Sequence, residues 1–84
     1  MLQQRCGDPS DLIRHKLATG LLPREMPIHF WAGYGTGKMC DACELSTTTK
    51  DIEYEVDMLD GCILRFHQQC LALWHQERAT YLRP

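Results

Sequence analysis

Two short stretches decide the fold of this chain: residues 40–43 read CDAC, and residues 67–70 read HQQC. Together they give the spacing C-x2-C-x23-H-x2-C. Zinc takes four such ligands in a tetrahedron, and two residues between the members of a pair let both side chains reach one ion. In the first turn of a helix, positions i and i+3 share a face, so HQQC can present both of its ligands on one side. The segment between the two pairs must then return to its starting point.

Residues 52–66 supply this return as a predicted β-hairpin. Apolar residues alternate with acidic ones up to Met58, and the alternation resumes after Asp60-Gly61, which is typical of two half-buried strands. A two-residue loop would mix apolar and charged residues on both faces, whereas a three-residue loop over 59–61 segregates them and places Gly61 in a left-handed bulge position. The pairs of this predicted register are Met58–Cys62, Val56–Leu64, Tyr54–Phe66 and Glu55–Arg65.

A first helix is predicted over residues 9–19. Asp8 is placed to cap it, Pro9 suits its first position, and Gly20 suits a left-handed stop. Its apolar side is too narrow for the helix to be stable alone, so we expect it to dock on the rest of the chain. The apolar positions are Leu12, Ile13 and Leu17, and the positions expected to face away are Arg14, His15 and Lys16.

Between this helix and the CDAC stretch, residues 23–39 hold two prolines and three glycines, which indicates a connector. Ile28, Phe30 and Trp31 are expected to enter the core from it. A last helix is predicted from about Gln68 to Thr80, with an apolar stripe of Cys70, Leu71, Trp74 and Tyr81. The chain is thus predicted to be one domain with four parts: a flexible arm (1–8), an N-terminal helix (9–22), a connector (23–39) and a metal-binding core (40–80).

Length and cysteine content agree with a small domain that a bound metal ion stabilises. A chain of 84 residues buries only about 60% of its unfolded surface, so its apolar core is marginal. Five cysteines cannot all pair within one chain, and the first residues lack the apolar run of a signal peptide. We therefore expect a reducing cytoplasm, where a cysteine cluster more often binds metal than forms disulfides. No apolar run is long enough to span a membrane, so no membrane contact is expected.

At this point the residues resemble a known family. CDACE followed by YEVDMLDGCILRFHQQC resembles a treble-clef zinc finger, with a knuckle, a hairpin and a helix, and is similar to small uncharacterised bacterial zinc-binding proteins. The resemblance covers about residues 33–80. It implies a small α+β fold with one structural zinc ion, and the implied ligands are Cys40, Cys43, His67 and Cys70. It implies no particular function, because the same core serves nucleic-acid, protein and catalytic roles.

Other readings of the cysteines and glycines were weighed. A thioredoxin-like dithiol would need a helix start within a βαβ unit, and the downstream hairpin argues against it. The run GYGTGK at 33–38 lacks the first glycine and the hydroxyl of a phosphate-binding loop, so its glycines are read as a close wrap around the knuckle, and the role of Lys38 stays open. Of the remaining candidates, Cys62 is expected in the core, Cys6 exposed, and His29 a spare ligand.

Three classes of function follow from these features. A protein-binding or regulatory module is favoured, through the acidic hairpin positions and imperfectly buried apolar residues. A nucleic-acid-binding finger is the alternative, although a net charge of -2 and a pI near 6.0 argue against it. An enzyme is disfavoured because a Cys3His set closes the zinc shell. The residues considered were Glu53, Glu55, Asp57, Arg65, Trp31, Trp74 and Leu22 for protein; Arg14, His15, Lys16, Lys38, Arg78 and Arg83 for nucleic acid; His29 and His75 for catalysis.

Overall fold

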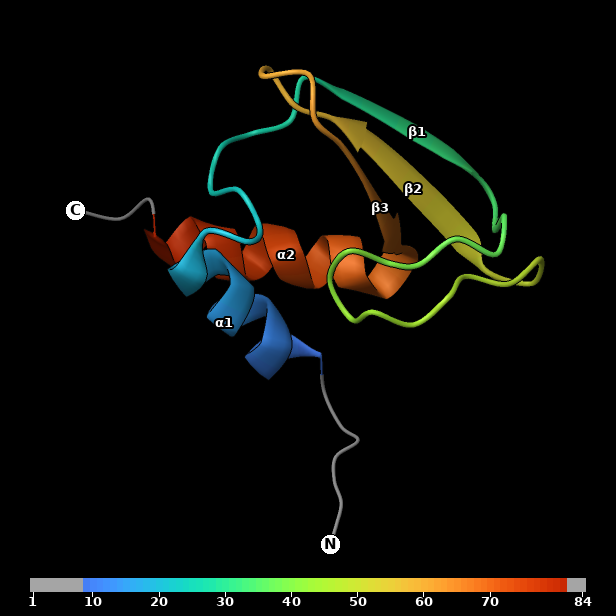
Figure 1. Ribbon diagram of the computed structural model, residues 1–84, viewed down its shortest axis with the longest axis horizontal. Coiled ribbons are helices and arrows are strands. Elements are labelled where there is room, and N and C mark those ends of the chain that lie inside the picture. Colours follow the sequence, from blue (N-terminus) through green and yellow to red (C-terminus); the bar gives the residue numbers. More distant parts are fainter. Residues whose placement is uncertain (1–8, 82–84) are drawn as a thin grey trace, which may run out of the picture.

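The computed structural model describes residues 9–81 and shows a small α+β fold, as predicted (Figure 1). Three strands form one antiparallel sheet in the order β1-β2-β3. A helix precedes the sheet and another follows it directly. The elements are α1 (Ser10–Thr19), β1 (His29–Tyr34), β2 (Ile52–Asp57), β3 (Ile63–His67) and α2 (Gln68–Tyr81).

Helix α2 forms the middle of the molecule, with α1 on one side and the sheet on the other (Figure 1). Its Trp74 is fully buried and stacks on Phe66 of β3, with ring centroids 5.0 Å apart. The indole N–H donates to the carbonyl of Pro23 at 3.0 Å, so this large side chain is buried without an unpaired polar atom. The core around it consists of Ile13, Leu17, Leu22, Cys40, Ala42, Val56, Met58, Leu64, Phe66, Cys70 and Leu71.

The hairpin between β2 and β3 has the predicted register. Tyr54 pairs with Phe66, Glu55 with Arg65 and Val56 with Leu64. The turn closes with a 2.8 Å bond from the Met58 amide to the Cys62 carbonyl, and Gly61 has a φ of 91°. Segregation of apolar and charged residues between the two faces was therefore enough to fix the pairing.

The first helix ends as predicted, at Gly20 with a φ of 83°, and begins at Ser10, one residue later than expected. The predicted cap Asp8 lies outside the described residues. One prediction about its faces was wrong: Lys16, expected in solvent, is only 7% exposed. Helix α1 lies against the 40–44 segment, where the Lys16 amino group finds polar partners. A lysine stem can be buried when its charged end is satisfied in this way.

The connector prediction was wrong for residues 29–34, which form strand β1 along the free side of β2. Ile28, Phe30 and Trp31 do not enter the core and remain 52%, 44% and 57% exposed. The physical reason is that α2 packs mainly against β2 and β3, while the contact of the edge strand with α2 is that of the Phe30 ring with His75. Backbone pairing, which the aromatic-rich run at 29–34 favours, holds this segment in place of side-chain burial.

Two further side chains depart from the predicted alternation. Cys62 is exposed although its position shares a face with Leu64, because it precedes β3 at the turn and lines an open groove. Glu53, expected on a solvated face, is 7% exposed because the loop after β1 folds over it. Among residues 9–81 no helix has both the length and the apolar character required to cross a bilayer.

Candidate metal centre

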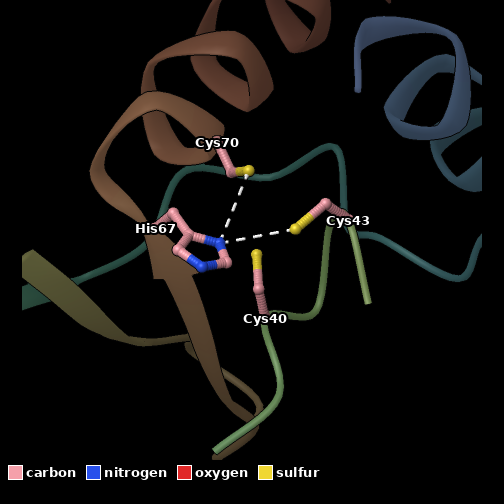
Figure 2. A group of neighbouring side chains, drawn as sticks. All are labelled: Cys40, Cys43, His67 and Cys70. Carbon is pink, nitrogen blue, oxygen red and sulfur yellow. Dashed lines mark hydrogen bonds between the residues drawn. The ribbon is translucent and has the colours of Figure 1, made fainter. Parts of the chain in front are cut away.

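Cys40, Cys43, His67 and Cys70 converge on one point, and their ligand atoms all lie within 4.8 Å of one another (Figure 2). The imidazole Nδ1 of His67 lies 3.4 Å from the sulfur of Cys43 and 3.9 Å from the sulfur of Cys70. In a tetrahedral zinc site with bonds of about 2.0–2.3 Å, neighbouring ligand atoms are about 3.3–3.8 Å apart. The four side chains therefore need only small rotations to hold one metal ion.

The first ligand pair lies on a tight knuckle. The amide of Glu44 donates to the carbonyl of Cys40 at 2.9 Å, and the amide of Cys40 donates to the carbonyl of Leu45 at 2.9 Å. Glu44 has a φ of 68°, a left-handed conformation that a non-glycine residue seldom adopts. This reversal turns the chain back immediately after Cys43, so both sulfurs point to the same side.

Asp41 fastens the knuckle to strand β3. Its amide donates to the Arg65 carbonyl at 2.8 Å, and its carboxylate accepts the Arg65 amide at 2.7 Å. The two bonds join the knuckle to the outer backbone edge of β3, two residues before the ligand His67. Sequence reasoning did not identify this positioning role of Asp41, because an aspartate between two cysteines gives no indication of its distant partner.

The second pair spans the junction between β3 and α2. His67 is the last residue of the strand and Cys70 lies in the first turn of the helix, so the i, i+3 spacing places both ligands on the inner side, as predicted (Figure 2). Cys40, His67 and Cys70 are buried, and Cys43 is half-buried at the rim. Burial excludes water from most of the site.

The three thiols differ in how readily they ionise. A hydrogen bond from Cys70 lowers the pKa of Cys40 to about 4 and outweighs the opposing effect of burial. The same contact, with burial, raises the pKa of Cys70. Burial raises the pKa of Cys43. Three sulfurs at this distance thus favour one thiolate among themselves, whereas a divalent cation would stabilise all three as thiolates.

Lys16 supplies a fixed positive charge beside the knuckle. Its amino group donates to the Asp41 carbonyl at 2.8 Å and pairs with the Glu44 carboxylate at 2.7 Å. The contact with Lys16 lowers the pKa of Glu44. Because Lys16 is paired with the Glu44 carboxylate, the pair adds no net charge to the site; it joins α1 to the knuckle. Lys38, whose role the sequence left open, is exposed.

Asp51 faces the other nitrogen of the ligand histidine. Its carboxylate lies 3.8 Å from Nε2 of His67 and accepts the Thr48 amide at 2.7 Å. A carboxylate on the far nitrogen of a metal-binding imidazole holds the ring in orientation and increases its basicity. Asp51 is therefore positioned to support a metal ion bound through Nδ1.

The glycine-rich run was predicted to wrap around the knuckle, but its close approach is at Gly35 and is made to Thr48, beyond the knuckle; a Cβ at Gly33 or Gly37 would meet nothing within 4 Å. A Cβ on Gly35 would collide with the carbonyl of Thr48, so only glycine fits there. Thr36 and Thr47 donate to the buried carboxylate of Glu53 at 2.9 and 2.8 Å. Burial alone would raise the pKa of Glu53, but these hydrogen bonds lower it. The run leads into the knuckle and not into a helix, unlike a phosphate-binding loop.

The remaining predicted candidates do not join the cluster. His29 lies on the edge strand and contacts Trp31, while Cys62 is exposed at the hairpin turn. Cys6 lies outside the described residues. Within residues 9–81, the side chains that meet with metal-ligand geometry are the four named above.

The surfaces predicted to bind partners are changed by the structure. Trp74 and Leu22 are fully buried, so neither is available at the surface. Of the acidic hairpin residues, Glu53 is buried, Glu55 lies 3.4 Å from Arg65, and Asp57 accepts the Trp31 indole at 3.3 Å. The predicted acidic face is therefore largely occupied by contacts within the chain.

The predicted basic set does not form a free surface either. Lys16 and Arg78 are buried. Arg14 pairs with Asp11 at 2.8 Å and lies 3.7 Å from Glu77. Arg83 lies outside the described residues. His15 and Lys38 are exposed.

No protein-family model, curated protein or solved structure matches the chain. The class that its own geometry defines is a small α+β domain with a Cys3His group able to hold one metal ion. The functional assignment rests on the residues described above.

Proposed function

We propose that the chain is a small domain built around one structural zinc ion and that it functions by binding another protein. The Cys3His cluster carries the first part of the proposal. Thiolate and imidazole donors suit zinc, whereas magnesium and calcium prefer oxygen. Four protein ligands complete a tetrahedron and leave no position for a water or a substrate, which is the arrangement of structural sites.

The order of elements supports a treble-clef-type core. A knuckle at 40–43 is followed by the β2–β3 hairpin, and the first turn of α2 returns to the knuckle with the second ligand pair. In this arrangement the metal joins the two ends of the hairpin. Because thiolate ligands persist in a reducing compartment, we propose the cytoplasm as the site of action.

The exposed apolar segment from Met26 to Tyr34 supports a role in protein binding. Five large apolar side chains on this strand or just before it are exposed: Met26, Ile28, Phe30, Trp31 and Tyr34. Exposed apolar surface concentrated on one element is typical of an interaction site. An edge strand also offers unpaired backbone groups that a partner strand can use. This segment replaces the acidic hairpin face as the proposed contact surface.

The zinc proposal is tested by elemental analysis of protein purified without added metal. We expect one zinc per chain in the wild type and substantial loss in Cys70→Ala. Cys62→Ala is the matched control, because Cys62 is an exposed thiol outside the cluster, and it should retain the full zinc content. Equal zinc contents in the two variants would remove the basis of the proposal.

A further inference from the structure

Arg78 is a buried cation near the end of α2, with only 4% of its surface exposed. Its guanidinium lies over the Trp74 ring, 5.3 Å from the centroid. One terminal nitrogen lies 2.7 Å from Nδ1 of His75 and 3.5 Å from the sulfur of Met26. The Nε–H group is buried and has no hydrogen-bond partner. The side chain is thus only partly satisfied.

The other arginines of the sheet and of α1 have carboxylates, and Arg78 does not. Arg65 lies near Glu53 and Glu55, and Arg14 pairs with Asp11. No carboxylate of residues 9–81 lies within ion-pair distance of Arg78. His75 cannot supply the missing negative charge, because an imidazole is either neutral or cationic; burial, together with Arg78, lowers the pKa of His75 and so disfavours its cationic form. A buried charge without a counter-charge is costly, so binding of an anion here is favourable.

The side chain of Met26, which lies against the Arg78 guanidinium, is apolar and flexible. Met26, which contacts the guanidinium through its sulfur, is itself 63% exposed. Methionine is flexible, so its side chain can move aside without disturbing the backbone. Phe30 contacts the ring of His75, with centroids 5.6 Å apart, and Ile28 lies two residues before Phe30 in the sequence. The unpaired cation thus lies beneath the same exposed apolar segment that is proposed to contact a partner.

We propose that Arg78, with Met26 over its guanidinium and the exposed apolar residues Ile28 and Phe30 nearby in the same segment, forms a docking site for an acidic side chain of a protein partner that is flanked by apolar residues. The carboxylate accepts hydrogen bonds from the Nε–H and a terminal N–H of Arg78, a bidentate geometry that arginine favours. The partner's apolar side chains cover Ile28 and Phe30. The inference rests on the proposed protein-binding function and specifies the chemistry of the partner.

The probe for this site is isocaproate, a leucine-like chain that ends in one carboxylate, with isocaproamide as its uncharged counterpart. Both are titrated into isotopically labelled, zinc-loaded protein while the arginine Nε–H resonances and the Met26 methyl are followed by NMR. We expect isocaproate to shift the Arg78 and Met26 signals and to bind at least about tenfold more tightly than the amide, because charge-assisted hydrogen bonds are the stronger ones.

The matched variants are Arg78→Met, which keeps most of the side-chain volume, and Arg65→Met on the sheet. Isocaproate binding should be lost in Arg78→Met and retained in Arg65→Met. Equal binding of acid and amide, or shifts confined to Arg65, would overturn the proposal. Stronger shifts at Arg78 with a single-stranded oligonucleotide than with isocaproate would overturn the choice of a protein partner.

Failure of this site is separable from failure of the zinc proposal. Arg78 follows the last ligand, Cys70, by two helical turns, and its contacts do not include a ligand residue. Each titration therefore begins from a sample with measured zinc content and a dispersed amide spectrum. If the zinc-loaded, folded protein does not bind isocaproate, the docking proposal is wrong and the metal proposal stands. If the purified protein contains no zinc, the metal proposal is wrong.

Discussion

Within residues 9–81, two junctions bury a lysine or arginine side chain, and they differ in how its charge is compensated. At the junction of α1 with the knuckle, Lys16 reaches the Glu44 carboxylate and the Asp41 carbonyl. At the junction of α2 with the connector, Arg78 reaches only His75, a methionine sulfur and an aromatic face. The first junction is electrostatically complete within the chain. The second is complete only if something outside the described chain provides an anion.

The difference indicates what each junction is for. A buried ion pair with its hydrogen bonds satisfied fixes one arrangement of the groups that it joins, and here it fixes α1 against the knuckle that carries Cys40 and Cys43. An incompletely satisfied cation under exposed apolar side chains stores free energy that a ligand can release. We therefore assign the α1 junction to the stability of the metal centre and the α2 junction to recognition.

The largest effect is expected from removal of the metal, which should disrupt the first junction and much of the core with it. Structural zinc contributes on the order of 10 kcal/mol in apparent binding free energy that is coupled to folding. We expect chelation by a strong chelator to abolish amide dispersion over residues 40–75, including the knuckle that Lys16 contacts. An unchanged spectrum in the chelated protein would show that the four side chains pack without a metal. Cys62→Ala should behave like the wild type before and after chelation.

Next in size is the effect of Lys16→Met on stability. The substitution leaves the Asp41 carbonyl without its donor and removes the partner of Glu44, while keeping a long apolar stem in place. We expect a loss of about 1–3 kcal/mol in the free energy of unfolding, the usual cost of leaving a buried polar group unpaired. Urea unfolding of the zinc-loaded protein measures it. Lys38→Met, at an exposed lysine, is the matched control and should change little.

The grouping of His67 with Cys70 and the hairpin register were predictable from sequence because both depend on local spacing. His67 ends β3 and Cys70 lies in the first turn of α2, so the two intervening residues bring both side chains to one side. The alternation on either side of Gly61 allows only one pairing that keeps the faces separate. Neither prediction required knowledge of what packs on the far side of the element.

Strand β1 and the burial of Lys16 were not predictable, because both depend on which surfaces other elements leave open. The run His29–Tyr34 carries a strand signal in its aromatic residues, but flanking prolines and glycines made it resemble a loop. Its exposure follows from the limited width of α2, which periodicity does not reveal. Lys16 lies one turn before Gly20 on a helix with a narrow apolar stripe. Its side of the helix is buried only because the knuckle packs against it.

Arg78→Met is expected to have a smaller effect on stability, either neutral or stabilising. Replacing a buried, unpaired cation by an apolar side chain of similar length is often neutral or stabilising. We expect the free energy of unfolding of this variant to be higher than that of the wild type, or at most about 1 kcal/mol lower. Arg65→Met, which removes the partner of Glu53 and Glu55, should instead destabilise. A large loss of stability in Arg78→Met would mean that this junction is as complete as that of Lys16, which removes the contrast between them.

The smallest effect concerns the titration of Glu44, the exposed end of the Lys16 junction. Because contact with Lys16 lowers the folded-state pKa of this carboxyl below its ordinary value of 4.5, the charged form stabilises the fold above that pH. This contribution is lost as the pH falls through the folded-state pKa. In Lys16→Met, NMR titration of the Glu44 side chain should give a pKa closer to its ordinary value, and Lys38→Met should leave it lowered. An equally low pKa in Lys16→Met would show that Glu44 is stabilised by the knuckle backbone and that Lys16 is held by the Asp41 carbonyl alone.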